Sequence, residues 1–88
     1  SNPIKKLSDI NEVEGQAKYV GDFVRSVLNY EKMKTIYEED VKNGFKKGME
    51  MNGSDMEKYK AEAIERATVL KNSGMKSYEI DRFSGGKP

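Results

Sequence analysis

The sequence predicts an all-α domain, a small bundle of three to four helices that ends in a helix-turn-helix-like αα-corner. Three observations predict it. Apolar residues recur every three or four positions, capping signals precede two of these stripes, and β-branched residues never alternate with period two over a useful length. We expect one helical domain over residues 11–84, preceded by an N-terminal arm at 1–10 and followed by a frayed tail at 85–88.

The first helical stretch should begin at Asn11, which can cap a helix and has Glu14 at the capping-box distance. Its spacing fits one long helix over 11–42 and equally fits two helices end to end. Gly15 and Gly21 lie inside the pattern, and each destabilises a helix by about 1 kcal/mol relative to Ala. We therefore expect either close approach of another helix or a break near Gly21. The apolar positions are Val13, Ala17, Val20, Val24, Val27 and Leu28, then Tyr30, Met33, Ile36, Tyr37, Val41 and Phe45.

The middle of the chain should be less regular, because three Gly and two Asn fall within residues 43–53. This composition predicts a loop or a frayed helix. Ser54 and Glu57 then form a capping box, and they predict a helix from about Asp55 to Asn72. Its apolar positions are Met56, Tyr59, Ala63, Ile64, Ala67 and Leu70.

The C-terminal part should turn sharply and end in a short helix. Gly74 supplies a left-handed residue that ends the preceding helix, and Met75 can fold back on its apolar face. A helix from about Ser77 to Phe83 follows. If this segment is a helix-turn-helix, the outward residues that could contact nucleic acid are Lys76, Ser77, Tyr78 and Arg82. Glu79 and Asp81 oppose phosphate binding, and an αα-corner that only closes the core is the structural alternative.

Composition excludes most catalytic chemistry. The chain has no Cys and no His, which excludes disulfides, Cys/His zinc sites, thiolate nucleophiles and imidazole bases. We expect no enzyme, no cofactor and no metal site. The carboxylates that could have formed a metal site are interleaved with Lys or Arg, which is typical of a solvated helix surface: Glu38, Glu39, Asp40, Glu62 and Glu65.

Charge and hydropathy set expectations about partners and location. Sixteen basic against fifteen acidic residues give a net charge of +1. The chain as a whole therefore has no strong electrostatic attraction for nucleic acid or acidic membranes. Apolar runs are too short for a membrane span or a secretory signal, and we expect a cytoplasmic protein. The Lys/Asn-rich, Cys-free composition suggests a bacterial or phage source, and Ser1-Asn2 is typical of a tag remnant.

Only 35 % of the 88 residues are apolar, so the chain has little to bury on its own. We therefore expect a non-catalytic protein-interaction or oligomerisation module, a homodimer or a complex with a protein partner. Met and Tyr suit such contacts because the thioether adapts to irregular surfaces and the phenol combines an apolar ring with a polar tip. The candidate interaction residues are Tyr30, Met33, Tyr37, Phe45, Met49 and Met51. A small DNA-binding regulator that uses residues 67–84 is the alternative.

The last part of the chain also resembles a known family. Ala67-Thr68-Val69-Leu70-Lys71-Asn72-Ser73-Gly74-Met75, followed by Lys76-Ser77-Tyr78-Glu79-Ile80-Asp81-Arg82-Phe83-Ser84-Gly85, resembles the helical C-terminal tail of PD-(D/E)XK-type transposase nucleases, the recombination-promoting nuclease group. Gly44-Phe45-Lys46-Lys47-Gly48-Met49-Glu50 is similar to that family's Gly-and-charge repeats. The resemblance covers residues 44–85 and lacks the family's catalytic motif. It therefore implies at most a non-catalytic accessory module.

Overall fold

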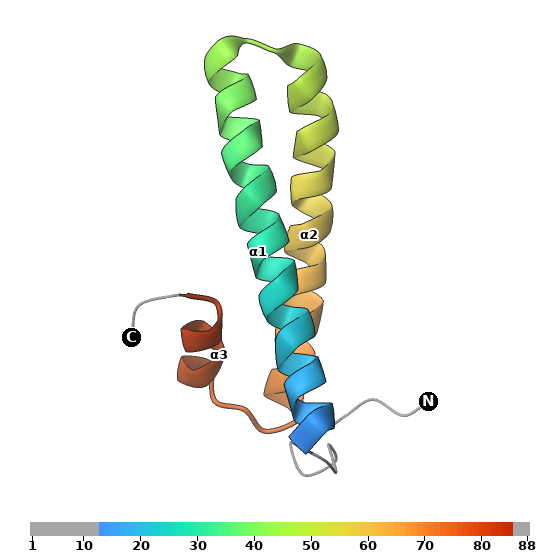
Figure 1. Ribbon diagram of the computed structural model, residues 1–88, viewed down its shortest axis with the longest axis vertical. Helices are drawn as coiled ribbons and strands as arrows, with labels where there is room; N and C mark the ends of the chain where they lie inside the picture. The colour runs from blue at the N-terminus through green and yellow to red at the C-terminus, as the bar shows by residue number, and fades with distance from the viewer. Residues whose placement is uncertain (1–12, 86–88) are drawn as a thin grey trace.

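The computed structural model describes residues 13–85, and this part of the chain is all-helical, with three helices and no strand. Helix α1 spans Val13–Asn43, α2 spans Lys46–Asn72 and α3 spans Ser77–Phe83. Figure 1 shows α1 and α2 as a long antiparallel hairpin, with the short α3 beside its open end. The predicted arm at 1–10, the Asn11 cap and the tail at 86–88 lie outside the described residues.

The first helical stretch is one continuous helix, which settles the question that its spacing left open. Helix α1 runs through Gly21 without a break. Close packing within the chain does not compensate for this glycine either, because nothing lies within 4 Å of the point where a Cβ would stand. Gly21 therefore lowers the stability of α1 without a compensating contact among the described residues.

The predicted loop at 43–53 and the predicted helix start at Ser54 are both wrong. The connection consists of Gly44, which adopts φ 66, and Phe45, and α2 begins at Lys46. The Phe45 backbone N–H donates to the Asp40 carbonyl at 2.9 Å and closes the turn. Two of the three glycines in this segment, Gly48 and Gly53, lie inside a helix, where they give room to side chains of the hairpin.

Two glycines of α2 mark this close packing. A Cβ on Gly48 would stand 2.5 Å from Cδ2 of Phe45 and 2.6 Å from Oδ2 of Asp40. A Cβ on Gly53 would stand 3.0 Å from the ring of Tyr37. The absence of a side chain at these two positions lets α1 and the turn approach α2. Glycine thus contributes here to packing between helices and does not interrupt the helix.

Two polar pairs fix the register of the hairpin. Arg66 donates to the hydroxyl of Ser26 at 2.6 Å near the open end, and Asn52 donates to the carboxylate of Asp40 at 2.7 Å near the turn. Ser26 and Asp40 are fourteen residues apart on α1, and so are Asn52 and Arg66 on α2. This separation is two heptads on each helix, so the same register holds along the whole contact.

Side chains at this heptad spacing, from Phe23 to Asp40 on α1 and from Met49 to Ser73 on α2, are all buried or half-buried. We call this contact between the two helices the seam. On α1 the seam consists of Phe23, Ser26, Tyr30, Met33, Tyr37 and Asp40, and on α2 of Met49, Asn52, Met56, Tyr59, Ala63, Arg66, Leu70 and Ser73.

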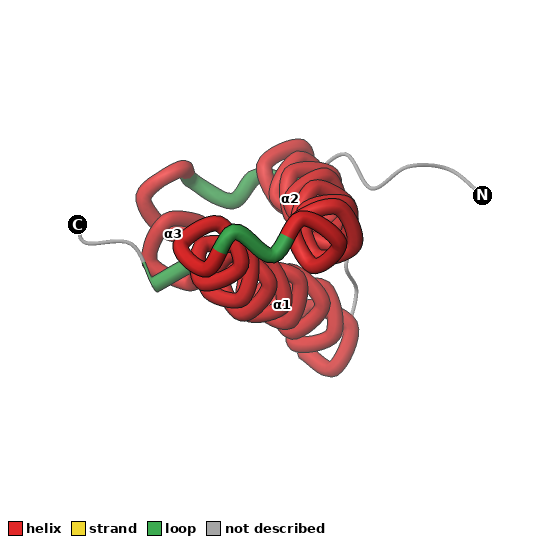
Figure 2. The backbone as a smooth tube through the Cα atoms, turned by 90° about the horizontal axis from the view of Figure 1, so that it is seen from above, coloured by secondary structure: helices red, strands yellow, loops and turns green. Residues whose placement is uncertain are grey.

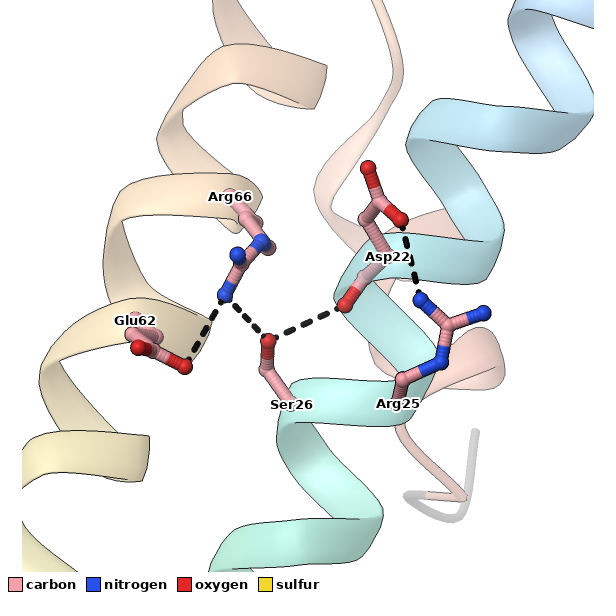
Figure 3. Close-up of polar contacts among 5 residues, drawn as sticks. All are labelled: Asp22, Arg25, Ser26, Glu62 and Arg66. Carbon is pink, nitrogen blue, oxygen red and sulfur yellow. Dashed lines mark hydrogen bonds and ion pairs between the residues drawn. The ribbon is translucent and has the colours of Figure 1, made fainter.

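The polar layer at Ser26 is fully hydrogen-bonded. Its hydroxyl donates to the Asp22 carbonyl at 3.0 Å and accepts from Arg66, which also pairs with Glu62 at 3.2 Å (Figure 3). Ser26 is buried, whereas the Arg66 side chain reaches partly into solvent. A shift by one heptad would place Arg66 opposite Met33 or Tyr19. The layer therefore favours one alignment of the hairpin over its neighbours.

The buried apolar core lies at the open end of the hairpin. Phe23 of α1, Leu70 of α2, and Met75 and Ile80 from the C-terminal part form it, and Val20, Val24, Val27 and Ala67 pack against it. Most members of the predicted stripes lie in the seam or pack against the core, but the stripes also contained errors. Phe23 was missing from them, while Leu28 and Ile64, both predicted as apolar-face members, are each 59 % exposed.

The two glycine environments predict opposite effects of the same substitution. Gly48→Ala should lower the free energy of unfolding by about 1 kcal/mol or more, because the methyl group must displace Phe45 and Asp40. Gly21→Ala should raise it by about 0.5–1 kcal/mol, because the helix gains propensity and the site is open. Urea unfolding at equal protein concentration measures both. Equal shifts in the two variants would contradict the packing of Gly48.

The hydrogen bonds of Ser26 predict that removal of its hydroxyl lowers the stability of the protein. Ser26→Ala should cost about 1 kcal/mol, because a part-buried guanidinium loses its acceptor on the opposite helix. Thr35→Ala is the matched control. Its hydroxyl also donates to the carbonyl four residues earlier, at 3.0 Å, but it lies exposed on α1. Thermal unfolding should show a fall of several degrees for Ser26→Ala and little change for Thr35→Ala.

Candidate interaction surface

The turn between α2 and α3 positions the C-terminal part of the surface. Gly74 adopts φ 104, its N–H donates to the Lys71 carbonyl at 3.0 Å, and the Met75 N–H donates to the Leu70 carbonyl at 3.1 Å. These two bonds define a Schellman motif. Leu70 and Met75 both belong to the buried core, which confirms that Gly74 ends the helix and that Met75 folds back.

Helix α3 has the bounds that the sequence predicted, and two contacts hold it. The Lys76 backbone N–H donates to the Glu79 carboxylate at 3.1 Å, which caps the first turn. Ile80 is buried against the core. Because the Ile80 side chain faces the core, the residues that flank it on the surface of α3 lie at the edge of the contact between α3 and α2.

A groove of about 230 Å³ lies between α2 and α3. Its floor is mainly apolar, with Ala67 from α2 and Ile80 from α3. Lys71 lies on the α2 wall, and Asp81 lies on the α3 wall. We call this feature the α2–α3 groove, and its lining residues are Ile64, Ala67, Thr68, Lys71, Ser77, Ile80 and Asp81. Figure 2 shows α2 and α3 from above, joined by a short loop.

One large exposed apolar side chain belongs to the lining of the α2–α3 groove. Ile64 on α2 is 59 % exposed. Tyr78 on α3 is 62 % exposed and follows the lining residue Ser77, but it does not itself line the groove. The groove is therefore a mainly apolar site with one large uncovered side chain on its α2 wall.

The six predicted interaction residues fall into two groups. Tyr30, Met33, Tyr37 and Met49 are half-buried in the seam, and Tyr37 packs against Gly53. Phe45 and Met51 are more than half exposed near the turn of the hairpin, where Val41 is also exposed. We call these three exposed residues, Val41, Phe45 and Met51, the hairpin tip. The first group contributes to the hairpin itself, and the second remains available to a partner.

The four predicted nucleic-acid contacts are all exposed on or beside α3. The Arg82 guanidinium lies 5.8 Å from the centre of the Tyr78 ring, within cation–π range. The same short helix carries Glu79 and Asp81, whose carboxylates would repel a phosphate backbone. Nucleic-acid binding by this segment therefore stays a prediction.

Metal-ligand clusters and membrane-spanning helices are absent from the described residues. No three His, Cys, Asp or Glu side chains of residues 13–85 gather as metal ligands. Among the described helices, none has the length and apolar character needed to cross a membrane. The α2–α3 groove and the hairpin tip are two apolar features that the described residues expose.

The Gly74 turn predicts the effect of a substitution that displaces α3. Gly74→Ala should cost about 1–2 kcal/mol, because an L-residue is strained at φ 104, and it should expose Met75 and Ile80. Gly85→Ala, also at a positive φ, follows α3 and should leave the core unchanged. Amide hydrogen exchange of residues 76–83 tests this difference. Equal protection in both variants would show that Gly74 does not hold α3 in place.

Comparison with known proteins adds no relative. No protein-family model, no curated protein and no solved structure matches the chain. The resemblance of residues 44–85 to a transposase-nuclease tail therefore stays an expectation from the sequence. The geometry of the α2–α3 groove and the hairpin tip carries the functional argument.

Proposed function

We propose that this chain is a non-catalytic protein-interaction module that self-associates as a homodimer. The observation that carries the proposal is the imbalance between buried and exposed apolar side chains. Among the described residues, four apolar side chains are buried, whereas eight large ones are 36–62 % exposed. The exposed residues are Tyr19, Leu28, Val41, Phe45, Met51, Ile64, Tyr78 and Phe83.

The shape of the molecule explains why one chain leaves so much apolar surface uncovered. Its principal extents are 48 × 32 × 18 Å, and the shortest is close to two helix diameters. A hairpin two helices wide can bury the residues of its seam, but the outer faces have no third layer except where α3 folds back (Figure 1). A second copy would supply the missing layer and increase the buried apolar area.

The charges of the α3 side chains favour self-association over binding to a DNA duplex. The helix has seven residues, and its one basic side chain, Arg82, is outnumbered by two acidic ones, Glu79 and Asp81. The exposed apolar side chains, by contrast, lie on all three helices and on the turn between α1 and α2. A surface of this kind suits a protein partner, in which apolar contacts provide affinity and mixed charges at the rim provide specificity.

The proposal predicts that stability depends on protein concentration. Over a dilution series from about 100 μM to 1 μM, the molar mass should fall from twice the chain mass toward the monomer mass, and the melting temperature should fall with it. Sedimentation equilibrium and thermal unfolding measure the two quantities. A monomer at every concentration, with a constant melting temperature, would sink the homodimer. Retardation of duplex DNA that Lys76→Glu and Arg82→Glu abolish would instead support the DNA-binding alternative.

A further inference from the structure

We propose that the homodimer forms across the α2–α3 groove about a two-fold axis, so that each copy covers the groove of the other. This inference rests on the proposed function and names the surface that carries it. A two-fold contact is isologous, which means that the same patch on both copies must be complementary to itself. The α2–α3 groove meets this condition in apolar content and in charge.

The apolar content comes from the floor of the groove and its α2 wall. The groove has a volume of about 230 Å³, and its lining is mainly apolar. Ile64 lies exposed on the α2 wall. A two-fold axis that runs along the groove exchanges the walls, so Ile64 of one copy approaches the α3 wall of the other. Each copy thereby covers an exposed aliphatic side chain of its partner.

The charges of the walls are opposite, and this selects a second copy as the occupant. Lys71 lies on the α2 wall, and Asp81 lies on the α3 wall. Neither forms an ion pair with another of the described residues. The exchange of walls sets Lys71 of each copy opposite Asp81 of the other, which gives two symmetry-related ion pairs at the rim. A partner of one charge sign would meet one favourable and one unfavourable wall.

The experiment uses the full chain and measures the dimer dissociation constant by sedimentation. Ile64→Asp should weaken the dimer about tenfold or more, because a carboxylate would enter the apolar contact. Leu28→Asp is the matched control. Leu28 is equally exposed, at 59 %, but it lies on α1 and does not line the groove, so the dissociation constant should stay within about twofold.

A charge exchange tests the two-fold arrangement itself. Lys71→Asp and Asp81→Lys should each weaken the dimer about fivefold, because each sets like charges against one another across the axis. The double variant restores opposite charges, and it should recover to within about threefold of the original dissociation constant. Circular dichroism confirms that each variant stays helical.

The outcomes separate failure of this surface from failure of the proposed function. If the protein is dimeric but Ile64→Asp leaves the dimer unchanged, or if the double variant is weaker than both single variants, the groove is not the two-fold contact and the homodimer stands. If the chain is a monomer throughout, both proposals fail. A melting temperature that Ile64→Asp lowers in that monomer would point to an occupant from the chain itself, such as residues 1–12.

Discussion

The hydrogen bond from Arg66 to Ser26 is the contact on which the rest of the molecule depends. It joins residues forty positions apart in the sequence and aligns the open end of the hairpin. With Ser26 opposite Arg66, Phe23 and Leu70 come together in the core. Met75 and Ile80 then pack on these two side chains, which sets the position of α3 beside α2. The α2–α3 groove therefore owes its geometry to one of the two polar pairs of the seam.

Polar residues in a helix–helix seam reduce stability relative to apolar ones but increase specificity. The apolar seam residues, such as Met33 and Met56, could pack in more than one register, because Met is flexible and unbranched. The pair Asp40–Asn52 near the turn and the pair Ser26–Arg66 at the open end agree on a single register. A chain with so few apolar residues thus obtains one defined hairpin, with a surface of fixed shape for recognition.

Much of the fold could be predicted from the sequence. The all-α class, the C-terminal turn at Gly74 and the bounds of α3 were predicted correctly, because local signals determine them. The middle of the chain was not. Gly48 and Gly53 are helix breakers by local propensity, and only the approach of Phe45, Asp40 and Tyr37 explains why they lie in a helix. The helix propensity of the residues does not show which side chains pack together across the hairpin.

The surface was harder to predict than the fold, for a related reason. The period of the apolar residues was correct, but it did not reveal that the polar Ser26 faces the second helix while Leu28 is exposed. Ile64 was expected on the buried face, whereas it stands on a wall of the α2–α3 groove. Which side of α2 receives α3 depends on the path of four residues after the helix, and periodicity within α2 does not encode that path.

The short link at Gly44 and Phe45 has a consequence for assembly. Every contact in the seam is made between one α1 and one α2, and none of these contacts distinguishes an α2 of the same molecule from that of a neighbour. If Gly44 left its left-handed conformation and Phe45, at ψ 86, also became helical, the two helices would join into a single rod about 90 Å long, and two rods could pair by exchanging halves. The backbone of two residues therefore separates a closed hairpin from an intertwined pair.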